Sequence, residues 1–166
     1  MKQWSIEDFV RNFICIDTAS PSGLRWVGHP NKAASTMRAG KPAGSMNKYG
    51  CFCTEIMGRS MRNHRLVWFL AHGLWPKGDI DHIDGNRVNN HPDNLRDISR
   101  AENGQNTIAL GYSWEESRKK WRASISVEGR PILIGRFKTE KEARHAYLKA
   151  KKKLHPTAPE RCFPNE

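Results

Sequence analysis

The chain has 166 residues, of which 28 are Lys or Arg and 17 are Asp or Glu, so its formal net charge is +11 at pH 7. This length predicts one domain plus a small module, and the basic excess indicates a polyanion or an anionic surface as a partner. No run approaches the roughly 20 apolar residues that cross a bilayer, and no charged-then-apolar leader opens the chain. We therefore expect an intracellular protein that does not bind a membrane.

The charge is unevenly distributed along the chain. Residues 1–75 carry 10 Lys and Arg against 4 Asp and Glu, a net +6; residues 76–106 carry 4 against 6, a net −2; and residues 107–166 carry 14 against 7, a net +7. An acidic centre between basic flanks suits a divalent-cation site that faces a phosphate backbone. Unrelated solvated surfaces are the alternative explanation.

The first part of the chain is predicted to form a helix, a strand, a loop and another strand. Ser5 is a good N-cap, and apolar residues at helical spacing predict an amphipathic helix over residues 6–14. Residues 23–27 are a plausible strand, and residues 46–57 predict a longer one. The intervening residues 28–45 are rich in Pro, Gly, Ser and Lys without a period, so we expect a loop that could lie along DNA.

A second helix is predicted over residues 64–72, ending at Gly73 with Pro76 beyond it. His64 stands at its start, where it either approaches a functional site or makes a structural hydrogen bond. Four basic residues cluster around the turn that precedes this helix, and phosphate contact and a solvated face explain them equally well: Lys48, Arg59, Arg62 and Arg65.

The four cysteines are scattered at positions 15, 51, 53 and 162. Cys51 and Cys53 are separated by one residue, which is not the usual spacing of zinc ligands. Residues two apart on a strand face the same side, so we interpret this pair as small buried hydrophobic residues and expect no structural zinc.

The polar run at residues 79–106 is the most informative stretch of the chain, because it holds five Asp, two His and six Asn with few apolar anchors. Turn signals at residues 84–86 and 91–94 divide it, and residues 95–98 are short enough for one strand. A Ser-x-x-Glu capping box begins at Ser99 and predicts a helix start there. The order is therefore strand, loop, strand and helix.

The C-terminal part shows a different pattern. Residues 120–127 alternate strictly between apolar and polar, residues 128–129 are a hairpin-type turn, and residues 131–137 are the expected return strand. A second capping box begins at Thr139 and opens a helix whose apolar stripe can cover one face of the sheet. The other, basic face is expected to remain uncovered.

Within the polar run and just before it, four segments resemble the HNH homing-type endonucleases, which are often borne by phages or introns and carry a ββα-metal site. These segments are HRLVW at 64–68, WPKGDIDHIDGN at 75–86, NNHPDNLR at 89–96 and ENGQN at 102–106. The resemblance implies that His82 is the general base, that Asp81 and Asn103 are metal ligands, and that Asn94 braces the loop. It also implies Mg²⁺ as the ion, for which Mn²⁺ can substitute. Adjacent residues of a regular strand point to opposite faces, so Asp81 and His82 share one phosphate only if the backbone bends or the phosphate wraps the strand edge.

Residues 111–150, GYSWEESRKKWRASISVEGRPILIGRFKTEKEARHAYLKA, resemble the APETALA2/ethylene-response-factor DNA-binding domain. The resemblance implies that the sheet enters the major groove of DNA. Six outward-facing residues would then face the DNA: Arg118, Lys120, Arg122, Ser124, Ser126 and Arg130. Ser124, Ser126 and Leu133 stand where that family usually has charged or aromatic residues, so groove binding is expected without strong base readout.

The expected fold class is α+β: a ββα-metal HNH nuclease core with N-terminal helix and strand elements, and a small C-terminal domain of a three-stranded sheet and a helix. The expected divisions are a nuclease region at 1–108, with the ββα-metal motif at about 79–108, an APETALA2-like domain at 111–155, and a disordered tail at 156–166.

The predicted function is a Mg²⁺-dependent DNA endonuclease, homing-type and nicking, that leaves 5′-phosphate and 3′-hydroxyl ends. Expected partners are double-stranded DNA and no small-molecule substrate, for a monomer or weak dimer in the cytoplasm of a host cell. The expected DNA contacts are Lys48, Arg59, Arg62, Arg65, Arg87, Arg118, Lys120, Arg122 and Arg130. The alternatives are a DNA-binding regulator with a vestigial nuclease site, and an RNA-binding module for which only the charge argues.

Overall fold

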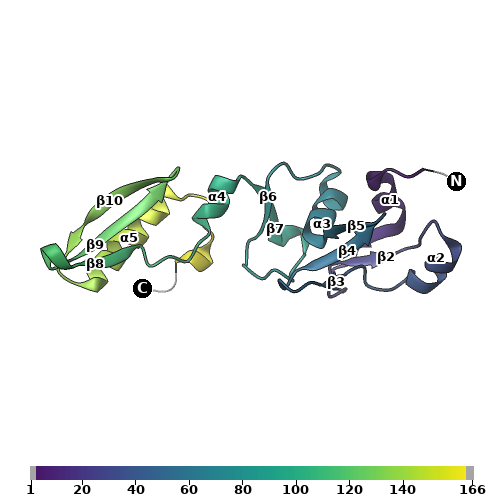
Figure 1. Ribbon diagram of the computed structural model, residues 1–166, viewed down its shortest axis with the longest axis horizontal. Helices are drawn as coiled ribbons and strands as arrows, with labels where there is room; N and C mark the ends of the chain where they lie inside the picture. Colours follow the sequence, from purple (N-terminus) through teal and green to yellow (C-terminus); the bar gives the residue numbers. More distant parts are fainter. Residues whose placement is uncertain (1–2, 164–166) are drawn as a thin grey trace. The chain divides into compact units, whose positions relative to one another are not determined.

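The computed structural model describes residues 3–163 and is a mixed α+β structure built from small antiparallel sheets (Figure 1). It divides into two compact units, residues 1–98 and residues 99–166, which are described separately. The helix after the polar hairpin therefore belongs to the second unit, whereas the sequence suggested a division near residue 108. Among the described residues, no helix combines the length and apolar character needed to cross a membrane.

The first unit opens with α1 (Ile6–Phe13), whose N-cap is Ser5 as expected: the Ser5 side chain accepts a hydrogen bond from the backbone N–H of Asp8 at 3.0 Å. The helix is one residue shorter than predicted, because Ile14 already begins strand β1 (Ile14–Ile16). β1 pairs antiparallel with β2 (Leu24–Trp26), the strand expected at residues 23–27.

The prediction of a loop over residues 28–45 is wrong for its middle, which forms helix α2 (Lys32–Arg38). The Asn31 side chain caps α2 by accepting from the backbone N–H of Ala34 at 3.1 Å. No residue of α2 is buried. A helix that buries no face carries no apolar period, so the pattern that reveals other helices is missing here.

The prediction of one strand over residues 46–57 is also wrong, because three short strands form an antiparallel sheet in the order β3-β4-β5. Their bounds are β3 (Ser45–Met46), β4 (Phe52–Ile56) and β5 (Arg59–Arg62). Asn47 makes the first turn, since its side-chain oxygen accepts from the backbone N–H groups of Tyr49 and Cys51. Met57 and Gly58 make the second, both with positive φ as in a type I′ hairpin turn.

All four cysteines are free thiols. Cys51 is buried as expected, whereas Cys53 is only half-buried and accepts a hydrogen bond from the Asn47 side chain at 3.3 Å.

Helix α3 (Asn63–His72) follows β5 directly and ends at Gly73, which adopts φ 78 in the left-handed region as its position predicts. α3 lies at the centre of the core of the first unit, since Leu66, Val67 and Phe69 are buried against α1 and the first strands. This core also includes Leu95. The polar hairpin is thus attached to the hydrophobic core by its second strand.

The hairpin consists of β6 (Asp79–His82) and β7 (Leu95–Ile98), with a long loop that ends in the 3₁₀ turn Pro92–Asn94. The strands are antiparallel, and their register places Asp81 opposite Arg96 and His82 opposite Leu95.

The second unit begins with α4 (Arg100–Gln105), where the predicted capping box is present: Ser99 and Glu102 exchange hydrogen bonds between their side chains and backbones. Three antiparallel strands follow in the order β10-β9-β8, namely β8 (Tyr112–Glu115), β9 (Lys120–Val127) and β10 (Arg130–Phe137). Helix α5 (Glu140–Leu154), capped by Thr139 as predicted, runs along the sheet (Figure 1). The hydrophobic core of the second unit is formed by residues of β9 and α5: Ala123, Ile125, Ala143, Tyr147 and Leu148.

The prediction of a disordered tail from Pro156 is wrong for residues 156–163, and residues 164–166 lie outside the described part of the chain. A 3₁₀ turn at Glu160–Cys162 buries Cys162, and Phe163 packs against the core of the second unit. The Cys162 thiol and the Arg161 guanidinium both donate to the backbone oxygen of Asn106. The sequence did not predict these contacts, because each one is made by a single residue of a tail with a mostly polar composition.

Candidate active site

Asp81 and Arg96 form an ion pair across the hairpin. Oδ2 of Asp81 accepts hydrogen bonds from Nε of Arg96 at 2.9 Å and from Nη2 at 2.7 Å. The two side chains lie opposite each other in the register, and they are 10% and 25% exposed respectively. The carboxylate expected to bind a metal is therefore partly buried and already bound by a guanidinium, which the sequence did not predict.

His82 lies on the other face of the same strand. It is opposite the core residue Leu95, and only 6% of its surface is exposed. Its Nε2 is 3.1 Å from the side-chain oxygen of Asn90, and its ring meets that of His64 edge-on, with 5.3 Å between the ring centres. Asp81 and His82 are thus adjacent in sequence but point to opposite faces of the hairpin.

His64, on the first turn of α3, is buried against His82. Burial lowers the pKa of His64 from its usual 6.5 to about 4, with smaller electrostatic contributions from the neighbouring His82, Arg62 and Arg65. His64 is therefore neutral at pH 7, and its ring lies against that of His82. Of the two roles that the sequence left open for His64, the structure supports proximity to the site.

Asn90 was not singled out from the sequence, although it contacts the imidazole of His82 directly. It is 3% exposed, and its side-chain nitrogen donates to the backbone oxygen of Ser22 at 3.1 Å. Burial distinguishes Asn90 from the other residues of the loop at 83–94, which are exposed or half-buried, and burial is not visible in sequence.

Asn94 holds the loop between the two strands of the hairpin. Its side-chain oxygen accepts from the backbone N–H of Asp84 at 3.0 Å, and its side-chain nitrogen donates to the Asp84 carboxylate at 2.9 Å and to the backbone oxygen of Asn89 at 2.8 Å. Partial burial acts to raise the pKa of Asp84, but hydrogen bonds from Asn89, the Asn86 backbone and Asn94 outweigh it and lower this pKa below its usual value. This geometry is what a loop brace requires.

The residues expected to hold a metal offer only hard oxygen donors. Asp81 supplies a carboxylate, and Asn103, on α4 of the second unit, supplies an amide. Within residues 3–163, no group of three or more His, Cys, Asp or Glu side chains is arranged to hold a metal ion. This donor chemistry fits Mg²⁺, which keeps several of its waters and binds through one or two protein oxygens together with substrate phosphate. The assignment of these two ligands stays a prediction.

Most residues expected to contact DNA are exposed and therefore accessible: Lys48, Arg59, Arg62, Arg87, Arg118, Lys120, Arg122 and Arg130. Arg65 differs from them. It is half-buried, and its guanidinium donates to the backbone oxygens of Gly78 at 3.0 Å and Pro76 at 3.3 Å. Arg65 therefore supports the segment that leads into β6.

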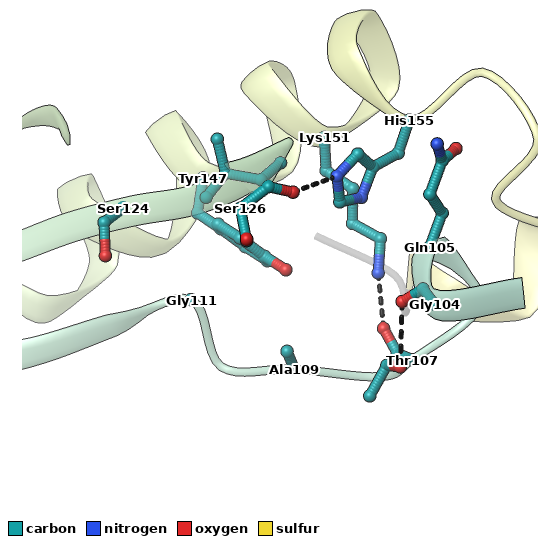
Figure 2. A pocket seen from close by; sticks show the side chains of 11 residues that line it. Gly104, Gln105, Thr107, Ala109, Gly111, Ser124, Ser126, Tyr147, Lys151 and His155 are labelled. Atoms are coloured by element: carbon teal, nitrogen blue, oxygen red, sulfur yellow. Dashed lines mark hydrogen bonds between the residues drawn. The ribbon is translucent and has the colours of Figure 1, made fainter. Parts of the chain in front are cut away.

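The second unit contains a cavity of about 200 Å³ beside the end of α5 (Figure 2). Lys151 is buried there, and its ammonium donates to the backbone oxygen of Thr107 at 2.5 Å. His155 donates from Nε2 to the backbone oxygen of Ser126 at 2.8 Å, while its buried Nδ1 has no hydrogen-bond partner among residues 3–163. Burial lowers the pKa of Lys151. The Lys151 contact ties the connector after α4 to α5, and the His155 contact ties the end of α5 to β9.

Comparison with known proteins identifies the class to which this hairpin belongs. Residues 62–105 match the family model described as HNH endonuclease, so the chain carries an HNH endonuclease domain. The chain is also 42% identical, over 81 residues, to Protein 3.8 of Escherichia phage T7, a similarity that covers 43% of this chain and 67% of the phage protein. It belongs to the same family as that phage protein. No solved structure matches the chain.

The HNH match contains the hairpin, its loop, α3 and α4, and with them all four residues expected to act in catalysis and metal binding: Asp81, His82, Asn94 and Asn103. It ends before residue 111, so the likeness of residues 111–150 to the APETALA2 domain stays a prediction.

Proposed function

We propose that this protein is a Mg²⁺-dependent, homing-type endonuclease that nicks double-stranded DNA and leaves 5′-phosphate and 3′-hydroxyl ends. The observation that carries the proposal is the HNH match over residues 62–105, because it coincides with a hairpin that presents Asp81 and His82 beside a braced loop. The net charge of +11 supports DNA as the substrate.

In this proposal His82 accepts a proton from the water that attacks the phosphorus. An imidazole suits this task because its usual pKa of about 6.5 leaves it largely neutral at pH 7. The buried position of His82 holds the ring in one orientation and limits its contact with bulk water. Asn94 fixes the loop that follows His82, and with it the backbone at the end of β6.

Asp81 and Asn103 would hold the divalent ion. When bound, such an ion neutralises charge on the phosphate and stabilises the departing 3′ oxygen. Arg96 orients the Asp81 carboxylate through Oδ2. Since Asp81 and His82 leave opposite faces of β6, the scissile phosphate must lie at the end of this strand, where groups from both faces are within reach.

A plasmid-nicking assay tests the proposal. Wild-type protein should nick supercoiled DNA in Mg²⁺ and not in EDTA, and His82→Ala should lower the rate by roughly 10²–10⁴ while DNA binding is kept. His91→Ala is the matched control, because His91 lies in the same loop but is exposed. Wild-type protein that binds DNA without cutting it would support the alternative, a DNA-binding regulator with a vestigial site. A denaturing gel with both strands end-labelled separates nicking from double-strand cleavage.

The second unit is proposed to bind DNA through the exposed basic face of its sheet. Lys120 and Arg122 are exposed on β9, on the face opposite the buried Ala123 and Ile125. Replacing both basic residues by Gln should flatten the salt dependence of DNA binding, by a slope of about 0.9 for each phosphate contact removed. An unchanged slope would mean that this face does not touch phosphate.

A further inference from the structure

The hydrogen bond between His82 and Asn90 determines which nitrogen of the imidazole can act as a base. Nε2 of His82 is 3.1 Å from Oδ1 of Asn90. Only one orientation of the Asn90 amide forms both of its hydrogen bonds, because its side-chain nitrogen is 3.1 Å from the backbone oxygen of Ser22. A carbonyl oxygen only accepts hydrogen bonds, so the NH₂ group of Asn90 must point to Ser22 and the amide oxygen must point to His82.

An amide oxygen is likewise only an acceptor, and therefore Nε2 of His82 must carry a proton. In a neutral imidazole one nitrogen is protonated and the other holds the lone pair. Nδ1 then holds the lone pair of His82.

The position of Ser22 is itself fixed by a buried polar network. Its backbone oxygen accepts a second hydrogen bond, from the side chain of Asn63 at 3.1 Å, and Asn63 also donates to the backbone oxygen of Ala43 at 2.9 Å and accepts from Thr54 at 2.8 Å. Ser22, Asn63 and Thr54 are at most 1% exposed. A fully bonded network of this kind is rigid, because breaking any one bond leaves a buried polar group without a partner.

Close packing at Gly23 brings Ser22 and Asn90 together. A Cβ atom at Gly23 would lie 2.8 Å from Cβ of Asn90, and the residue adopts φ +76, which glycine tolerates best. The loop at residues 20–23 is therefore shaped to receive Asn90, although the two lie far apart in sequence.

We propose that Asn90 is a positioning residue that holds His82 in the tautomer protonated at Nε2, so that Nδ1 is the atom that accepts the proton from water. Ser22 supplies the fixed acceptor that orients Asn90, and it lies before the segment that matches the HNH family. The N-terminal region thus sets the chemical state of the general base. This inference rests on the proposed function of His82.

The tautomer is measurable without any cleavage assay. In protein labelled with ¹⁵N-histidine, at a pH where the ring is neutral, His82 should show a protonated Nε2 and an unprotonated Nδ1. The chain has seven histidines, so His82→Gln assigns the signals by their disappearance. A wild-type His82 protonated at Nδ1 would overturn the proposal, whatever the fate of any variant.

Variants then connect the tautomer to the rate. Asn90→Leu keeps the size of the side chain and removes its hydrogen bonds, so the share of His82 protonated at Nε2 should fall, and kcat for nicking should fall about 10²-fold with KM for DNA unchanged. The control is Asn86→Leu, an exposed Asn of the same loop whose side chain accepts a hydrogen bond from the backbone N–H of Val88. Asn90→Asp keeps the acceptor for His82 and should retain the Nε2-protonated tautomer if it folds.

The outcomes separate this inference from the proposed function. If His82→Ala nicks DNA like the wild type, the assignment of His82 as the base fails, even if the tautomer is as stated. If His82→Ala is inactive but Asn90→Leu folds, keeps the same tautomer and nicks at the wild-type rate, the positioning role of Asn90 fails alone.

Discussion

Replacing Arg96 by Met should destabilise the protein without metal and make it more responsive to Mg²⁺. In the wild type, Arg96 binds Oδ2 of Asp81 through two N–H groups. Met keeps much of the aliphatic length of Arg but removes the charge, so the carboxylate is left partly buried without its guanidinium. The same change removes a competitor for any cation that binds Asp81.

The magnitude follows from the exposure of the pair. Exposed ion pairs contribute at most about 1 kcal/mol, whereas removing one partner of a fully buried pair costs about 3–5 kcal/mol. The Asp81 side chain is 10% exposed and that of Arg96 is 25% exposed, which places the pair between these limits. We expect the free energy of unfolding of Arg96→Met to fall by about 2 kcal/mol in EDTA.

Saturating Mg²⁺ should recover part of this loss. A ligand that binds only the folded state stabilises it according to its concentration relative to Kd, so tenfold tighter binding adds about 1.4 kcal/mol. Urea unfolding with and without Mg²⁺ measures the difference, and titration calorimetry measures Kd directly. Arg87→Met is the control, because Arg87 is an exposed residue of the same hairpin. If Mg²⁺ stabilises Arg96→Met no more than it stabilises the wild type, Asp81 is not a metal ligand.

Three further predictions concern stability. His64 has a pKa of about 4 in the folded protein and 6.5 in the unfolded chain, so the unfolded chain binds more protons between these pH values. Above pH 6.5 His64 does not reduce the free energy of unfolding, and as the pH drops to 4 it lowers this free energy by about 3 kcal/mol. Urea unfolding at pH 4.5 and 7 measures this loss of stability, which His64→Gln should remove and the control His72→Gln, at an exposed position, should keep. Equal behaviour of the two variants would contradict the lowered pKa of His64. Asn94→Ala loses three side-chain hydrogen bonds and should cost about 2–3 kcal/mol, against under about 1 kcal/mol for Asn86→Ala; similar losses in urea unfolding would argue against a brace. Truncation after His155 should expose the second unit to limited proteolysis, because Cys162 is buried; unchanged resistance would show that the tail contributes nothing.

Local signals were sufficient for several parts of the fold. The capping boxes at Ser99 and Thr139 and the glycine stop at Gly73 are formed by residues a few positions apart, and the structure has all three. The alternation of residues 120–127 likewise predicted which residues of β9 are buried. Helix α2 escaped detection because it buries no residue, and its sequence therefore carries no apolar pattern.

The sequence by itself determined that the chain holds a polar hairpin that carries Asp81, His82 and Asn94, because these residues lie within one short segment and motifs of this length are local. The tertiary structure alone decided what these residues contact: Arg96 reaches Asp81 through the strand register, and Ser22 reaches Asn90 across 68 positions of sequence. A buried polar group bonds to whichever polar group the folded backbone brings within about 3 Å of it. Such hydrogen bonds therefore depend on packing rather than on spacing along the chain.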